Sequence, residues 1–170
     1  MTARLLERRT AGSRWGFKGP QAGDWLAAQG LALPAAPNTV ATGAAGNLLI
    51  ARLGSAEFFI ESEDGALGAE LAQKLAVPPS GVYPVLREDW AFALAGADVH
   101  EVLAQVCNVN FAALALEPVP VIMTLMVGVA VLVVPQAAPS GARRYRIWCD
   151  PTFGPYLSEA LGAVVVESGE

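Results

Sequence analysis

The apolar positions of the chain recur at two spacings: every second residue, which is typical of strands, and every third or fourth, which is typical of helices. Gly and Pro interrupt these runs and mark the ends of the predicted elements. The first half is predicted to contain a strand at Trp15–Phe17, a helix from Pro20 to Ala28, an irregular connection at Leu31–Gly46, a hairpin of Leu48–Leu53 and Glu57–Glu61, a helix with Leu67, Leu71 and Leu75 on one face, and a strand at Val82–Arg87.

The second half repeats this order of periodicities. Asp98 is predicted to cap a helix, because Glu101 follows three residues later as a capping box requires. The predicted elements are a strand at Trp90–Ala95, a helix with the apolar stripe Val99, Val102, Leu103 and Val106, strands at Val121–Met126, Val129–Val134 and Arg144–Cys149, a helix at Phe153–Leu161, and a strand at Ala163–Glu167.

The two halves also share residues at matching positions. A Trp-x-Phe pair precedes a glycine in each half, and the pattern Leu67-Gly68-x-x-Leu71 is matched by Phe153-Gly154-x-x-Leu157. Both halves are interpreted as β-α-β-β-α-β, the split arrangement. We therefore predict an α+β fold with duplicated halves packed as one compact domain. The predicted divisions are a basic N-terminal arm at 1–13, a first half at 14–88 and a second half at 89–170.

The N-terminal arm is basic and lacks the apolar run of a signal peptide, so secretion is not expected. Its charges are Arg4, Glu7, Arg8 and Arg9, with Arg14 just beyond it. Two interpretations remain open: the arm lies on another protein, or it is a solvated terminus.

The segment Val119–Val134 carries no charge, but it is shorter than the roughly 20 residues that a membrane helix needs. It is rich in valine and contains Gly128 near its middle. We therefore interpret it as two buried strands joined around Val127-Gly128, with a membrane helix as the alternative.

The composition limits the class of protein. Apolar residues make up 54% of the 170 residues and charged residues 16%, with a net charge of −5 and a mean hydropathy of +0.42. High hydropathy excludes intrinsic disorder, and the acidic balance disfavours non-specific nucleic-acid binding. Charged residues usually make up about a quarter of a globular domain, and the fraction here is well below that value. We therefore expect the protein to depend on a partner to cover its surface.

Few residues suggest catalysis. His100 is the only histidine and is expected on a helix surface, while Cys107 and Cys149 are expected as free buried thiols, so a zinc site is not predicted. The glycines Gly12, Gly16, Gly19 and Gly23 do not fit a nucleotide-binding fingerprint. The acidic run Glu61–Asp64 is interpreted as a solvated turn that leads into a helix.

The densest polar cluster surrounds a predicted strand near the C-terminus. It contains Arg143, Arg144, Arg146, Tyr145 and Trp148. Alternation places Arg144 and Arg146 on one face, where guanidinium groups suit an anionic ligand or an acidic partner surface, while a plain solvated edge strand is the other interpretation. We predict Arg143, Arg144, Arg146 and Trp148 as a partner contact.

Several stretches resemble the gamma subunit of heterotetrameric sarcosine oxidase, and the resemblance extends over nearly the whole chain. The matching stretches are Arg14–Pro20, Asp24–Gly30, Pro34–Asn38, Leu48–Phe59, Leu94–Asp98, Thr124-Leu125 and Tyr145–Leu161, which includes Phe153-Gly154-Pro155-Tyr156-Leu157. This family is similar in fold to the folate-binding domain of the glycine-cleavage T protein.

The resemblance implies an accessory, non-catalytic small subunit of a cytoplasmic complex that oxidatively demethylates sarcosine or a similar N-methyl amino acid. It implies larger alpha and beta subunits that carry FAD, FMN, NAD and a tetrahydrofolate site, and no cofactor on this chain. The small subunit of N-methylglutamate dehydrogenase is an equivalent relative. No residue matches the T protein's catalytic aspartate motif, so no catalytic, cofactor-binding or metal residue is assigned. The alternative is a free-standing folate-binding protein similar to an aminomethyltransferase.

Overall fold

A computed structural model describes residues 5–43, 46–137 and 143–167. The chain divides into two compact units, an N-terminal unit of Ala11–Glu88 and a C-terminal unit of Asp89–Glu170 together with Met1–Thr10. Each unit contains one antiparallel five-stranded sheet and two α-helices in the described residues. The predicted α+β class is confirmed, and the boundary between the two units falls between Glu88 and Asp89, where the sequence pattern divides the halves.

The N-terminal unit is built on a sheet with the strand order β3-β4-β5-β2-β6. The predicted hairpin and both predicted helices are present, but the segment 31–46, expected to be irregular, contributes the edge strand β3. The elements are β2 (Ser13–Lys18), α1 (Ala22–Ala28), β3 (Thr39–Thr42), β4 (Leu48–Gly54), β5 (Glu57–Ser62), α2 (Gly65–Lys74) and β6 (Tyr83–Val85).

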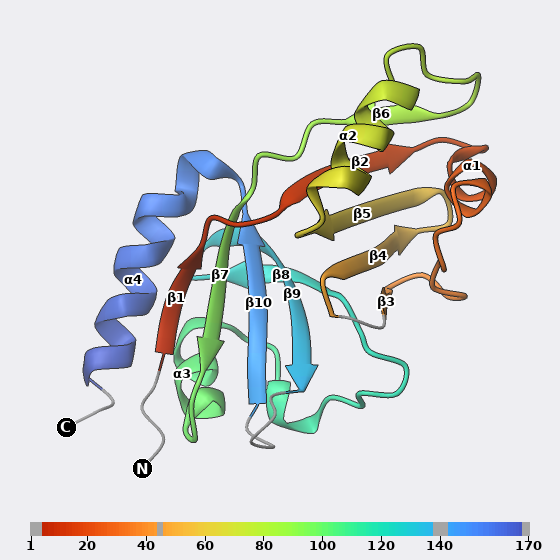
Figure 1. Ribbon diagram of the computed structural model, residues 1–170. Coiled ribbons are helices and arrows are strands. Elements are labelled where there is room, and N and C mark those ends of the chain that lie inside the picture. The colour runs from red at the N-terminus through yellow and green to blue at the C-terminus, as the bar shows by residue number, and fades with distance from the viewer. Residues whose placement is uncertain (1–4, 44–45, 138–142, 168–170) are drawn as a thin grey trace. The chain divides into compact units, whose positions relative to one another are not determined.

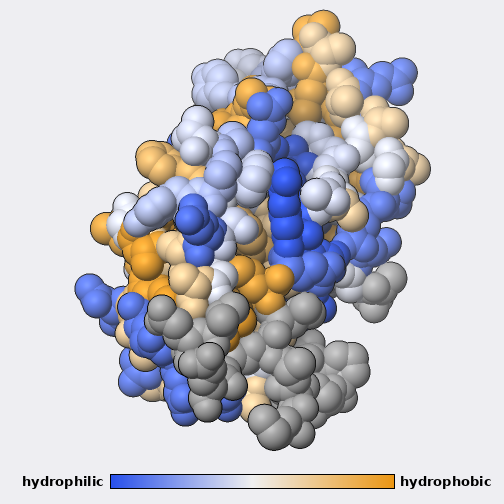
Figure 2. Space-filling model, turned by 90° about the vertical axis from the view of Figure 1, so that its left-hand side faces the viewer, coloured by the Kyte–Doolittle hydropathy of each residue, from blue (hydrophilic) through white to orange (hydrophobic). Residues whose placement is uncertain are grey.

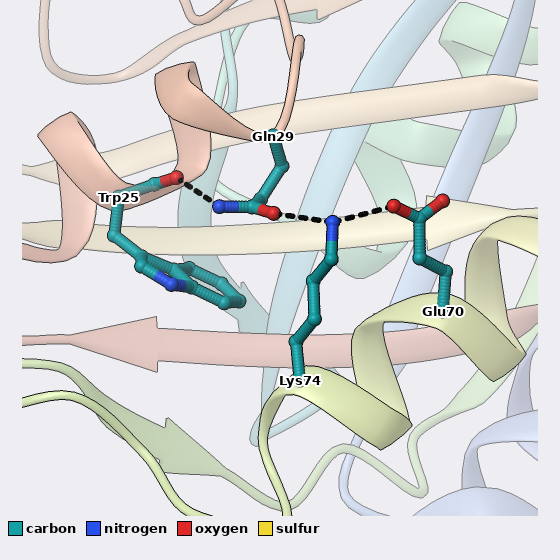
Figure 3. A network of polar contacts seen from close by, with 4 residues as sticks. All are labelled: Trp25, Gln29, Glu70 and Lys74. Carbon is teal, nitrogen blue, oxygen red and sulfur yellow. Dashed lines mark hydrogen bonds and ion pairs between the residues drawn. The ribbon is translucent and has the colours of Figure 1, made fainter.

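Helix α1 packs its buried Leu26 on the sheet, in a core with Phe17, Phe58 and Ile60. A polar network joins α1 to α2 (Figure 3). Lys74 Nζ donates to Gln29 Oε1 at 2.7 Å, and Gln29 Nε2 donates to the Trp25 carbonyl at 3.0 Å. Lys74 also pairs with Glu70 one turn earlier. Because the Lys74 and Glu70 side chains are largely exposed, their ion pair contributes little to stability.

The C-terminal unit has the strand order β1-β7-β10-β9-β8. Strand β7 spans the same residues as the prediction. The elements are β1 (Leu5–Arg9), β7 (Trp90–Ala95), α3 (Val99–Val106), the 3-10 turn η1 (Phe111–Ala113), β8 (Ile122–Met126), β9 (Val129–Ala137), β10 (Arg143–Cys149), the 3-10 turn η2 (Pro151–Phe153) and α4 (Gly154–Glu167).

Helices α3 and α4 cover the same face of this sheet (Figure 1). Val102 and Leu103 of α3 and Leu157 and Leu161 of α4 join the alternate side chains of β7, β9 and β10 in one core. Asp98 occupies the predicted N-cap position of α3, but its side chain makes no capping hydrogen bond, so the predicted capping box is not formed. The apolar stripe of that helix is buried, as predicted.

The uncharged segment forms a hairpin, as predicted. Strands β8 and β9 pair from Met126↔Val129 outward, and the two turn residues, Val127 and Gly128, have φ of 43° and 85°. Positive φ at both positions is the type I′ geometry that matches strand twist. Among the described helices, none has the length and apolar character needed to cross a membrane.

The end of the chain differs from the prediction. Residues 163–167, expected as a strand, continue helix α4. Valine favours strands, but Val164 and Val165 follow Leu157 and Leu161 at helical spacing and pack on the same core. The predicted strand at Ala163–Glu167 is therefore wrong, because tertiary packing outweighs local propensity.

Strand β1 lies within the segment 1–13 and occupies the outer position beside β7. Arg8 lies over the Trp90 ring, 3.6 Å from its centre. The two sheets have corresponding orders when the C-terminal sheet is counted from β8, because β7 is then fourth, as β2 is in the order that begins at β3. In each half, the preceding strand belongs to the sheet of the other unit. Strand β1 precedes β2 but pairs with β7, and β6 precedes β7 but pairs with β2. An internal duplication remains a prediction that this correspondence favours.

Candidate functional site

Strand β10 carries the predicted contact residues and lies between β7 and β9. Alternation separates its side chains as predicted. Tyr145, Ile147 and Cys149 belong to the core, and Arg144, Arg146 and Trp148 lie on the opposite face. Arg143 falls on the same side as Tyr145. The four predicted residues therefore do not share one face.

Burial further divides this group. Trp148 is 1% exposed and Arg146 is 7% exposed, with the Arg146 guanidinium 5.4 Å from the Trp148 ring centre. Arg144 is partly exposed and lies 3.6 Å from Glu7 Oε2 on β1. A partner that docks without rearrangement reaches only Arg143 and Arg144 of the predicted set.

His100 of α3 is held against the sheet by a buried tyrosine. His100 Nε2 lies 2.8 Å from the Tyr145 hydroxyl, and that hydroxyl also faces the Phe111 carbonyl at 3.5 Å. Burial and then the nearby Arg143 charge lower the pKa of His100, and burial raises the pKa of Tyr145. The histidine, expected on the helix surface, is partly buried and ties α3 to β10.

Both cysteines are free and buried, as predicted. Burial, with the nearby Asp89 and Asp150 carboxylates, raises the pKa of Cys149 to about 11. A thiol with so high a pKa is a poor nucleophile at neutral pH. Within the ranges that the structure describes, no group of three or more His, Cys, Asp and Glu side chains is arranged to hold a metal ion.

The acidic run Glu61–Asp64, which begins within β5, is only partly the solvated turn that the sequence suggested. Asp64 caps α2 by accepting from the Ala66 amide at 2.8 Å. Glu61, in contrast, is buried and accepts from Arg14 Nε at 2.6 Å. The solvated interpretation of Glu61 is wrong, because cross-strand pairing with Arg14 provides the countercharge that burial of a carboxylate requires.

A pocket of about 330 Å³ lies in the N-terminal unit between α1 and the β4–β5 turn. Asp24, Arg52 and Phe58 line it, together with Gly19 and Gly23. The guanidinium of Arg52 already donates to the carbonyls of Pro34, Ala35, Gly54 and Ser55. Arg52 therefore fixes the surrounding loops, and most of its donors are not available to a ligand.

These observations define a two-unit α+β protein. Neither a family model nor a curated protein matches the sequence. The fold is similar to a chain of heterotetrameric sarcosine oxidase from Corynebacterium sp. U-96, solved in complex with pyrrole 2-carboxylate. The TM-score is 0.76 at 22% identity, over 96% of this chain and 84% of that chain.

A second similar fold is glycine cleavage system aminomethyltransferase T from Bartonella henselae. Its TM-score is 0.60 at 17% identity, over 94% of this chain and 45% of that protein. This chain therefore spans less than half of the aminomethyltransferase. Both likenesses confirm the fold expected from the sequence resemblance.

Proposed function

We propose that this protein is an accessory small subunit, of the gamma type, in a heterotetrameric amine-oxidising complex. The observation that carries the proposal is the fold likeness to a chain of heterotetrameric sarcosine oxidase, which extends over 96% of this chain and 84% of that chain. The sequence resemblance, which rests on separate residues, supports the same assignment.

The surface of the described chain supports this role. Seven large apolar side chains are more than half exposed, among them Met123, Leu125, Phe153 and Tyr156 of the C-terminal unit. Figure 2 shows the side of this unit that carries α4, where hydrophobic residues reach the surface between hydrophilic ones. Exposed apolar side chains that are grouped, such as Met123 and Leu125 on β8, favour a site that a partner covers.

In this proposal the complex oxidatively demethylates sarcosine or a similar N-methyl amino acid in the cytoplasm. The alpha and beta type subunits carry FAD, FMN, NAD and tetrahydrofolate, and this chain supplies no catalytic residue. N-methylglutamate is a second candidate substrate, because the sequence resemblance extends to the small subunit of its dehydrogenase.

The test is purification of the native complex through a tag on this chain, followed by native mass spectrometry and a flavin absorption spectrum. We expect two larger flavin-containing subunits at fixed stoichiometry and flavin reduction on addition of sarcosine or N-methylglutamate. A stable monomer that recovers no flavoprotein would contradict the proposal.

The fold likeness to the aminomethyltransferase favours a second candidate, a free-standing folate-binding protein. Titration of the purified chain with tetrahydrofolate, followed by calorimetry, separates the two. Micromolar or tighter binding by the isolated chain would favour the second candidate, and no binding is expected if the folate site belongs to a partner.

A further inference from the structure

The inference concerns β8, which forms one edge of the sheet in the C-terminal unit. The two-residue turn makes Met126 and Val129 a hydrogen-bonded pair, so Thr124↔Val131 and Ile122↔Val133 are the next such pairs. In the pairs between them, the main-chain groups point away from the partner strand. The N–H and C=O groups of Met123 and Leu125 therefore point outward from the sheet edge.

These four main-chain groups have no backbone hydrogen-bond partner among the described residues. The side chains of Met123 and Leu125 lie on the same face of the strand and are 53% and 60% exposed. A free edge that carries two exposed apolar side chains is a template for another strand.

The two edges of this sheet differ in charge. The opposite edge strand, β1, carries Glu7, Arg8 and Arg9, and such charges protect an edge from pairing. No charged residue occurs anywhere between Glu117 and Arg143, a stretch that includes β8. The β8 edge therefore lacks the charges that keep β1 from recruiting a further strand.

We infer that β8 is extended by a strand from a larger subunit of the complex, with uncharged apolar side chains over Met123 and Leu125. This inference rests on the proposed function. A second copy paired through β8 alone would bury only two five-residue edges, far less than the roughly 1,200–2,000 Å² of a stable interface. The added strand is one part of a larger contact, as a subunit interface provides.

The test uses the complex purified through a tag on this chain and measures amide hydrogen exchange at single-residue resolution. The Thr124 amide, which bonds to β9, is the internal reference. We expect the amides of Met123 and Leu125 to be as protected as that of Thr124. Rapid exchange at Met123 and Leu125 in an intact complex would overturn the inference and leave the proposed function in place.

Two variants test the contact separately. Leu125→Pro removes one outward N–H and spares the ladder to β9, while Leu125→Lys places a charge on the apolar face. Each is expected to lower recovery of the larger subunits at least about tenfold, whereas the matched Leu125→Met is expected to leave recovery unchanged. Circular dichroism of each purified variant shows whether it is folded.

The remaining outcomes are distinct. Full recovery with folded Leu125→Pro and Leu125→Lys overturns the inference alone. Self-association of the wild-type chain that Leu125→Lys abolishes, in the absence of larger subunits, would replace the partner strand by a second copy. Failure of the wild-type chain to recover any larger subunit overturns the proposed function together with this inference.

Discussion

Arg14 and Glu61 are direct cross-strand neighbours on β2 and β5, and Arg14 Nε lies 2.6 Å from Glu61 Oε2. Their side chains are only 10% and 4% exposed. Removal of one member of a buried ion pair leaves the other as an uncompensated charge, which is costly. This pair is therefore a sensitive point in the N-terminal unit.

We expect Glu61→Ala to lower the free energy of unfolding by about 3 kcal/mol, because the Arg14 guanidinium loses its carboxylate. Urea denaturation followed by circular dichroism measures this change. The matched control is the double variant Arg14→Met with Glu61→Leu, which removes both charges and is expected to lose less. A single variant as stable as the double one would show that the pair is unimportant.

Two glycines on α4 are expected to respond oppositely to alanine. A Cβ at Gly154 would overlap the indole of Trp90, whereas a Cβ at Gly162 meets nothing within 4 Å. Gly154→Ala is expected to destabilise by about 1–3 kcal/mol through overpacking. Gly162→Ala is expected to stabilise by roughly 0.5–1 kcal/mol through helix propensity. Thermal melts of both variants measure the difference, and equal melting temperatures would refute the packing argument.

The single histidine is expected to make the stability of the protein change with pH in the acid range. Burial and Arg143 lower the folded-state pKa of His100 below its ordinary value of 6.5, so the unfolded chain binds the proton first. Stability is therefore lost as the pH falls from about 6.5 toward the lowered pKa. The measurement compares urea midpoints of wild type and His100→Gln from pH 7.5 to 5. Below pH 6.5, the urea midpoint of the wild type is expected to fall more steeply with pH than that of His100→Gln. Parallel curves of midpoint against pH would contradict the prediction.

Cys149 is expected to be unreactive in the folded protein. Burial and the neighbouring carboxylates raise its pKa from 9.0 to about 11, which lowers the thiolate fraction at pH 8 by about 100-fold. Iodoacetamide labelling followed by peptide mass spectrometry should modify Cys149 only after denaturation. Because the unfolded thiol ionises first, the raised pKa also predicts that stability falls between pH 9 and 11. Cys149→Ser should reduce this loss, and the raised pKa of Tyr145 accounts for a further part of it.

The spacing of apolar residues was sufficient to predict most helices and strands, because the apolar face of each is buried within a single unit. The stripe Val99, Val102, Leu103 and Val106 and the uncharged hairpin around Gly128 are examples, since local spacing and turn chemistry specify each of them. The alternation in β10 likewise separated Arg144 and Arg146 from Tyr145, because the side-chain period of a strand is fixed.

Local pattern failed where a distant segment decides the outcome. The sequence pattern around β10 predicted a contact group but could not show that Trp148 and Arg146 are buried, because burial depends on the packing around the whole sheet. The solvated interpretation of Glu61 failed for the same reason, because its partner, Arg14, is 47 residues away.

By itself the sequence determined the α+β class, the helix and hairpin positions and the shortage of charge, because these depend on composition and on short-range periodicity. Only the tertiary structure decided that Leu5–Arg9 pairs with β7, that the chain's last valines continue a helix, and that β8 is a free edge. These features depend on which segments meet in space, and non-local pairing leaves no periodic signal in the chain.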